Sequence, residues 1–200
     1  CLAAGKKSSM VTEGFGDLLN KEQFGKGIVS RKKQVLPIII DTLKWYTNTI
    51  EVICMKEFIV DEGFWEIFPE ASIAVLAVKN VQESIHLDDE KAAEIKALLD
   101  SANEGAKKYL TSDVISENAV VKTWREAYSK FPTKKGARCS IEALLKRVLH
   151  GTPVGSIAPT VDITNAISLK YAFPIGAENM EAFKGDLHLG IMKGGEDFWP

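Results

Sequence analysis

The sequence predicts an α+β fold in which helices pack on short mixed β-sheets. A Val- and Ile-rich run at residues 72–81 has the pattern of a buried strand, and residues 185–196 alternate like a half-exposed strand. Between them, residues 88–110 keep the three-and-four apolar spacing of a long helix. Strands that are few, short and widely separated favour α+β over a regularly alternating α/β sheet.

The length predicts one principal domain. The chain has 200 residues, 46% of them hydrophobic, which is enough to bury a sizeable core. Compact-domain patterning begins at Met55, so we expect a domain over residues 55–200. Residues 1–54 lack a consistent period, and we expect them to be an upstream extension outside the fold; a small helical appendage at residues 38–53 is the alternative.

The first half of the expected domain contains a short strand and two helices. Residues 58–68 predict a strand or turn followed by a helical turn that presents Phe64 and Trp65. The acidic residues that open the segment 88–110 suit a helix N-terminus. A second helix is expected within residues 118–131, with Trp124 facing inward.

Two further helices are predicted in the second half. In the first, Ser140 is the expected N-cap, Leu145 belongs to the apolar face, and Gly151 ends the helix. The second carries Asp162 near its start, as an N-cap or first-turn acid, and Pro174 stops it.

Charge is unevenly distributed along a chain whose formal net charge is -2. Residues 55–121 carry six Lys/Arg and fourteen Asp/Glu, whereas residues 122–149 carry eight Lys/Arg and two Asp/Glu. A local basic block of this kind can contact a phosphate backbone; the alternative is a solvated helix face with a lysine-rich loop. The candidate RNA contacts are Lys134, Lys135, Arg138, Lys146 and Arg147. We expect one of the last three to pair with Glu142, which lies four residues before Lys146.

Several kinds of site are absent from the sequence pattern. The three cysteines and three histidines are scattered, so neither a disulfide framework nor a metal site is expected, and a reducing cytoplasm is the expected location. Charged residues interrupt the most apolar stretch, which argues against a membrane span. No phosphate-binding glycine loop is present, and we expect no cofactor and no ligase activity.

A series of motifs in the C-terminal half resembles a known domain. They are WREAY (124–128), ARCSIEALLKRVLHG (137–151), VDITNAISL (161–169), PIGA (174–177), GDLHL (185–189) and GGE (194–196). Their order and spacing resemble the B3/B4 domain, the tRNA-editing module of the bacterial phenylalanyl-tRNA synthetase beta chain, which also occurs as small free-standing proteins. The resemblance covers residues 55–200. Because the family domain continues beyond GGE, we expect this chain to be truncated at its C-terminus.

The resemblance implies a substrate site and an activity. Thr164 and Asn165 match the pocket-lining Thr-Asn pair of the family, with Asp162 beside them. The implied partner is the acceptor end of a tRNA or aminoacyl-tRNA, and the implied activity is hydrolysis of a mischarged aminoacyl ester. Gly176 stands where the family pattern has a histidine; a glycine there lets a ligand approach the backbone closely. The alternative function is therefore a non-catalytic module that binds an amino-acid-like or nucleotide-like ligand.

Overall fold

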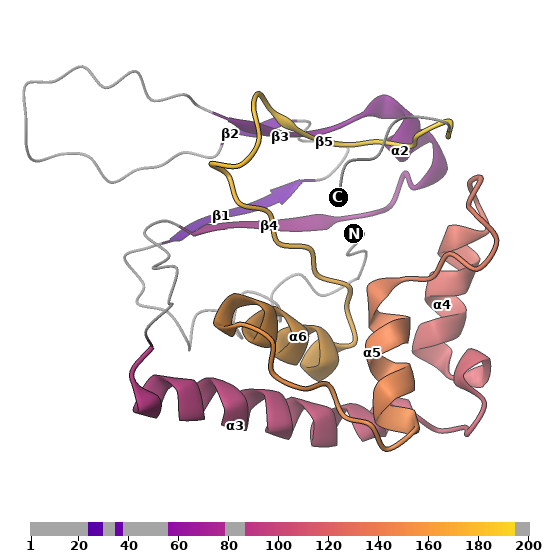
Figure 1. Cartoon of the computed structure of the whole chain (residues 1–200). Coiled ribbons are helices and arrows are strands. Elements are labelled where there is room, and N and C mark those ends of the chain that lie inside the picture. Colours follow the sequence, from indigo (N-terminus) through magenta and orange to yellow (C-terminus); the bar gives the residue numbers. More distant parts are fainter. Residues whose placement is uncertain (1–23, 30–34, 38–55, 79–86, 195–200) are drawn as a thin grey trace, which may run out of the picture. The chain divides into compact units, whose positions relative to one another are not determined.

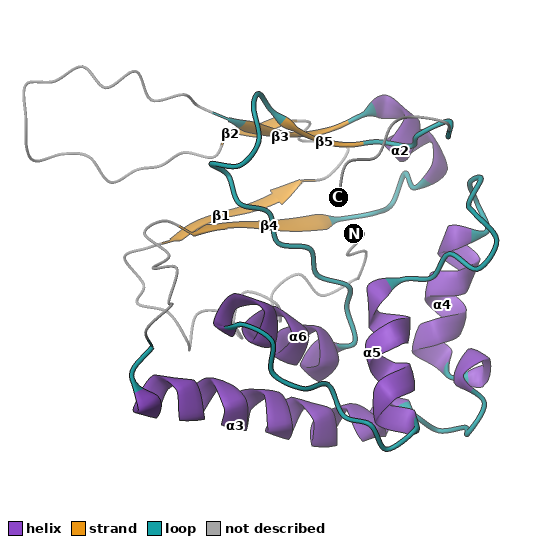
Figure 2. Ribbon diagram, in the orientation of Figure 1, coloured by secondary structure: helices purple, strands orange, loops and turns teal. Residues whose placement is uncertain are grey.

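The computed structural model describes residues 24–29, 35–37, 56–78 and 87–194 (Figure 1). They fall into two compact units. Residues 87–178 form a helical unit, and the described residues up to 78 together with 179–194 form a unit that contains the strands. Figure 2 shows this division of helices and strands. The α+β class predicted from the sequence is confirmed.

Four α-helices and two short 3-10 turns make up the helical unit in the described residues. The elements are α3 (Asp89–Ala106), η2 (Lys107–Tyr109), η3 (Ile115–Glu117), α4 (Ala119–Tyr128), α5 (Ser140–Leu149) and α6 (Pro159–Tyr171). Asp88 caps α3, because its side chain accepts a hydrogen bond from the backbone N–H of Lys91 at 2.8 Å. The predicted helices at 88–110, 118–131 and 140–151 are therefore confirmed.

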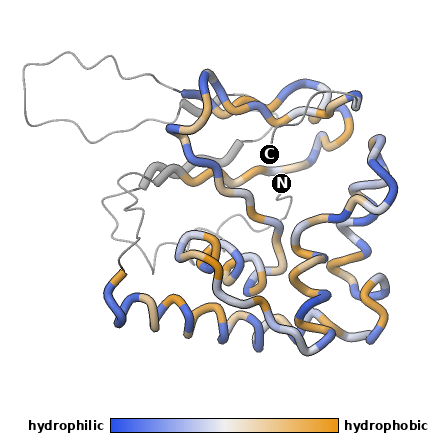
Figure 3. The backbone as a smooth tube through the Cα atoms, in the orientation of Figure 1, coloured by the Kyte–Doolittle hydropathy of each residue, from blue (hydrophilic) through white to orange (hydrophobic). Residues whose placement is uncertain are grey.

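The core of the helical unit lies where α3 packs along α6 and where α5 reaches both. Hydrophobic residues recur along one side of α3 in Figure 3, and Leu99 and Ala106 of that stripe are buried. Helix α5 contributes Ile141 and Leu145, neither of which is exposed to solvent. This burial stabilises the unit by the apolar area that it removes from water.

Two buried asparagines fix the connections between these helices. The Asn103 side chain donates to the carbonyl of Val154 at 3.0 Å and accepts from the N–H of Val154 at 2.8 Å, which ties the segment before α6 to α3. The amide of Asn118, which is completely buried, makes five hydrogen bonds to backbone groups of residues 111–115. Both side chains therefore satisfy backbone groups that a packed loop would otherwise leave unpaired.

Two small sheets form the other unit. Strand β1 (Phe24–Val29) pairs antiparallel with β4 (Ile73–Val78). Strand β3 (Glu57–Val60) pairs antiparallel with β2 (Val35–Pro37) and parallel with β5 (Leu187–Leu189). The predicted strand at 72–81 and the alternating strand at 185–196 are confirmed by β4 and β5.

Helix α2 (Glu62–Ile67) follows β3 directly and supplies the largest buried side chains of this unit. Phe64 and Trp65 are fully buried and meet edge to face, with their ring centroids 5.2 Å apart. The sequence pattern of residues 58–68 predicted a strand or turn followed by a helical turn, and β3 and α2 confirm these elements.

Two strands lie within the segment that we expected to be an upstream extension. Both β1 and β2 belong to residues 1–54, and they are hydrogen-bonded to β4 and β3. The remainder of residues 1–54, including the alternative helix at 38–53, lies outside the described residues. The expected domain boundary at Met55 stays a prediction, and the pairing of β1 and β2 weighs against it.

One predicted helix start is wrong by one residue. The N-cap of α5 is Cys139, not Ser140, and the Ser140 hydroxyl is buried with no hydrogen-bond partner among the described residues. The Cys139 side chain is buried in the core, and we attribute the earlier N-cap position to this packing. The predicted end of the helix at Gly151 is confirmed, because Gly151 has the positive φ of +69° typical of a residue that follows a helix.

Candidate functional site

Helix α6 carries three of the predicted site residues and begins as the sequence suggests. Pro159 occupies the first turn, where its missing N–H costs nothing. Asp162 lies in the same turn and is only 2% exposed. Its carboxylate accepts hydrogen bonds from the N–H of Ile157, at 2.8 Å, and from the hydroxyl of Ser156. Asp162 is therefore a first-turn acid that holds the preceding segment against the helix.

Thr164 and Asn165 lie one turn further along α6, and both are half-buried. The Thr164 hydroxyl donates to the carbonyl of Val161 at 2.9 Å, which leaves its oxygen free to accept. Among the residues that the structure describes, no hydrogen bond joins the Asn165 side chain to Asp162 or to another group. Asn165 therefore offers an amide donor and acceptor that the helix does not use.

Two apolar side chains near the start of α6 are exposed. Ile157, in the segment that precedes the helix, is 75% exposed, and Val161 in the first turn is 37% exposed. Val161 lies three and four residues before Thr164 and Asn165, so these three share one side of α6. Exposed apolar groups beside unused polar ones are the composition of a ligand-binding surface. We call Ile157, Val161, Thr164 and Asn165 the α6 face.

Gly176 is exposed in the segment that follows α6. The helix ends at Tyr171, and Ala172 adopts a left-handed conformation with a φ of 55°. Beyond it, the Ser168 hydroxyl donates to the carbonyl of Phe173, and Pro174 is buried. The C-cap of the helix is therefore Ala172, two residues before Pro174, which was the predicted stop.

The predicted RNA contacts lie on two segments of the helical unit. Lys134 and Lys135 are exposed in the loop between α4 and α5, and Lys146 and Arg147 are exposed in the last turn of α5. Arg147 also donates to the carbonyl of Pro153 at 3.3 Å. These four cations remain accessible to an anionic partner.

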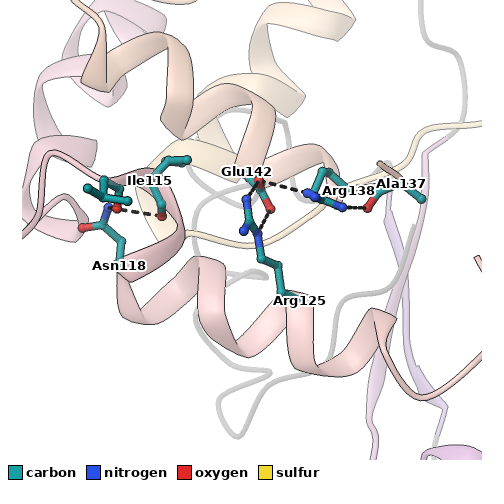
Figure 4. Close-up of polar contacts among 7 residues, drawn as sticks. Ile115, Asn118, Arg125, Ala137, Arg138 and Glu142 are labelled. Atoms are coloured by element: carbon teal, nitrogen blue, oxygen red, sulfur yellow. Dashed lines mark hydrogen bonds and ion pairs between the residues drawn. The ribbon is translucent and has the colours of Figure 1, made fainter. Parts of the chain in front are cut away.

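Arg138, the fifth predicted RNA contact, forms an ion pair with Glu142 (Figure 4). Its Nε lies 3.5 Å from the Glu142 carboxylate, so the prediction that one of the candidate cations pairs with Glu142 is confirmed. The stronger partner is Arg125 on α4, which the sequence reasoning missed. Its Nε and Nη2 donate to the two carboxylate oxygens at 3.1 and 2.6 Å. The hydrogen bond to Glu142 raises the pKa of the Arg125 guanidinium, opposed by a smaller effect of burial.

The thiol beside this cluster is unsuited to nucleophilic chemistry. Burial raises the pKa of Cys139, with smaller opposing contributions from backbone hydrogen bonds, so the unreactive protonated thiol is favoured. Burial also raises the pKa of Tyr128, and contact with Cys139 adds to this effect. Both residues therefore serve packing between α4 and α5.

Two other features, a metal site and a membrane-spanning helix, are absent from the described part of the chain. No group of three His, Cys, Asp or Glu side chains within it is arranged to hold a metal ion. None of the described helices combines the length and apolarity needed to cross a membrane.

Comparison with known proteins gives one similarity, in the C-terminal part of the chain. No curated protein and no solved structure matches the chain significantly. Residues 123–200 match the family model of the B3/4 domain. This match contains α5, the α6 face, Gly176 and all five predicted RNA contacts. The resemblance to the B3/B4 domain is therefore supported by a family-model match over residues 123–200.

Proposed function

We propose that this protein binds the acceptor end of a tRNA and hydrolyses a wrongly attached amino acid in trans. The observation that carries the proposal is the α6 face, where Thr164 and Asn165 of the family motif present unused hydrogen-bonding groups beside exposed apolar side chains. The B3/4-domain match over residues 123–200 supports it, because the motifs in that span resemble the editing module of the phenylalanyl-tRNA synthetase beta chain. The cytoplasm is the expected location.

The chemistry asked of the α6 face is modest. An aminoacyl ester is already activated, so hydrolysis needs a positioned water and hydrogen-bond donors near the oxygen that becomes negative. The Asn165 amide can donate to that oxygen, and the Thr164 oxygen can accept from the water or from the amino group. Ile157 and Val161 offer apolar surface to the amino-acid side chain. No cofactor enters this scheme.

The accessible cations provide the contact with tRNA. Lys134, Lys135 and Lys146 are exposed and can each neutralise one phosphate. We expect the triple change to glutamine to weaken tRNA binding and to reduce the slope of log affinity against log salt by roughly two to three, about one for each lost contact. Fluorescence anisotropy with a labelled tRNA, at salt concentrations from about 50 to 200 mM, measures the affinity and its salt dependence.

Three lysines in and next to α3 offer a matched control. Lys91, Lys96 and Lys107 are also exposed, but each pairs with an acidic residue three or four positions away. Changing these three to glutamine removes the same charge and should leave the salt slope nearly unchanged. Equal effects from both triple variants would contradict a defined RNA surface, and binding that is unmeasurable at low salt in the unmodified protein would end the tRNA proposal.

Hydrolysis is tested with charged tRNA. The full chain is incubated with tyrosyl- and phenylalanyl-tRNA for the phenylalanine tRNA, and loss of the ester is followed over time. We expect Asn165→Ala to slow the hydrolysis by on the order of 10²-fold, the usual effect of removing one donor to a developing oxyanion. Asn179→Ala, at an exposed asparagine outside the α6 face, should have no effect.

A non-catalytic function is the second candidate, and Gly176 favours it. At the position of the family histidine this chain has an exposed glycine, which supplies no side chain to orient water. A module that only binds would be stabilised by free amino acids or nucleosides through mass action, without consuming charged tRNA. A thermal-shift series with these ligands, compared with the deacylation assay, separates the two functions.

A further inference from the structure

An Asp–His pair lies on the three-stranded sheet, and its histidine belongs to the GDLHL motif at residues 185–189. His188 is the middle residue of β5, and Asp61 directly follows the neighbouring parallel strand β3. The Nδ1 atom of His188 lies 2.9 Å from Oδ1 of Asp61. Because the ionised carboxylate only accepts hydrogen bonds, the ring proton sits on Nδ1 and the lone pair of Nε2 is left available.

The position of Asp61 makes this contact unexpected. Asp61 is the N-cap residue of α2, where an aspartate normally accepts a hydrogen bond from the first turn, yet its side chain makes no capping bond. The side chain turns to His188 instead, and both side chains are about half exposed. A surface ion pair contributes little to stability, and a side-chain cap contributes at least as much. Stability of the fold therefore does not explain why the Asp61 side chain contacts His188 and does not cap α2.

A glycine makes room for the arrangement. A Cβ atom at position 190 would overlap Oδ2 of Asp61, so the carboxylate occupies space that any other residue at that position would fill. Gly190 lies two residues after His188 on the same strand side, and the N–H of Asp61 donates to the carbonyl of Leu189 at 2.9 Å. Backbone pairing thus brings the three residues together, and the missing Cβ leaves the carboxylate free to reach the imidazole.

We infer that Asp61 and His188 form a general acid–base site for the hydrolysis of carboxylic esters. Nε2 of His188 removes a proton from water while the water oxygen forms a bond to the acyl carbon and the carbonyl electron pair moves to oxygen. When the tetrahedral intermediate collapses, the alkoxide leaves and takes the proton back from Nε2, which gives a carboxylic acid and an alcohol. Asp61 holds the ring in the required tautomer and stabilises the imidazolium, so it is a positioning residue.

The charged residues near the Asp61–His188 pair favour some ester substrates over others. Residues 56–66 and 184–194 carry five Asp/Glu and three Lys, and the ammonium of Lys56 is held by the carbonyls of Met180 and Phe183. An acidic surface of this kind repels anions such as phosphodiesters. The expected substrate is a neutral or cationic carboxylic ester. The inference stands on the β3–β5 pair alone and is independent of the tRNA proposal.

The test uses the full chain and ethyl dichloroacetate, a neutral ester whose poor leaving group favours general-base attack by water over attack by imidazole. We expect His188→Ala to lower the protein-dependent rate by about 10²-fold. Asp61→Asn should lower it by about 10-fold, and should have no further effect in the His188→Ala background, because Asp61 acts through the ring. Gly190→Ala should resemble Asp61→Asn.

His150 provides the control, since it is exposed and no carboxylate partner for it is present among the described residues. His150→Ala should leave the rate unchanged. A readout without activity is the nitrogen NMR spectrum of the His188 ring, which should show the Nδ1–H tautomer in the unmodified protein and lose that preference in Asp61→Asn. Equal small losses from His188→Ala and His150→Ala would overturn the inference, and so would an Nε2–H tautomer in the unmodified protein.

Discussion

Replacing Asn118 by leucine is expected to lower the free energy of unfolding of the helical unit by about 4 kcal/mol. Oδ1 of Asn118 accepts from the N–H groups of Thr111 and Ser112 at 2.7 and 3.0 Å. Nδ2 donates to the carbonyls of Ser112, Val114 and Ile115 at 3.1, 3.2 and 3.3 Å; Figure 4 shows the last of these bonds. Leucine has nearly the same volume, so the loss reports unpaired backbone groups and not a cavity. Urea denaturation measures it.

Asn165 provides the control for this prediction. It belongs to the same unit and is half-buried, but no hydrogen bond is recorded for its side chain among the described residues. Asn165→Ala should therefore change stability by less than about 1 kcal/mol while it impairs hydrolysis, which is the reverse of the behaviour at Asn118. A loss below about 1 kcal/mol for Asn118→Leu would show that the loop at 111–118 does not depend on this side chain.

Replacing Arg125 by methionine is expected to cost about 3 kcal/mol of unfolding free energy. Glu142 is 5% exposed, and without the two hydrogen bonds from Arg125 its buried carboxylate keeps only the longer contact with Arg138. The value lies at the low end for a broken buried pair, because the Arg125 side chain itself is 36% exposed and water reaches it. Chemical denaturation compares the variants.

Two further variants separate the charge effect from packing. Arg138→Met should cost less than about 1 kcal/mol, since that side chain is 46% exposed and its contact is long. The double change Arg125→Met with Glu142→Met removes both charges and should recover most of the loss. If the double variant is as unstable as Arg125→Met alone, the loss arises from packing of the arginine stem and the ion-pair explanation is wrong.

The periodic elements were predictable because each depends on neighbours in sequence. The stripe that contains Leu99 and Ala106 fixes α3, and the Val/Ile run fixes β4. The start of α5 was misplaced because Ser140 is a better cap than Cys139 by type, whereas burial of the Cys139 side chain decides the entry angle. Local preference yields to tertiary packing at such positions.

Pairings over long separations were not predictable. Asp162 was recognised as a first-turn acid, but its bonds to Ser156 and Ile157 depend on how the preceding segment folds back. Arg125 and Glu142 lie seventeen residues apart in the sequence, on two different helices, and the Asp61–His188 pair spans 127 residues. The family motif located Thr164 and Asn165 within the site proposed here, yet the exposure of Ile157, in the segment before α6, carries no signal in the sequence.

The decisive measurement is an amide NMR titration with a non-hydrolysable analogue, 3′-amino-adenosine carrying tyrosine in amide linkage. If the α6 face holds the aminoacyl end, the largest shifts will fall on Val161, Thr164, Asn165 and the segment around Gly176, and Asn165→Ala will abolish them. Shifts confined to other helices, or saturation that Asn165→Ala leaves unaltered, would show that the aminoacyl group binds elsewhere.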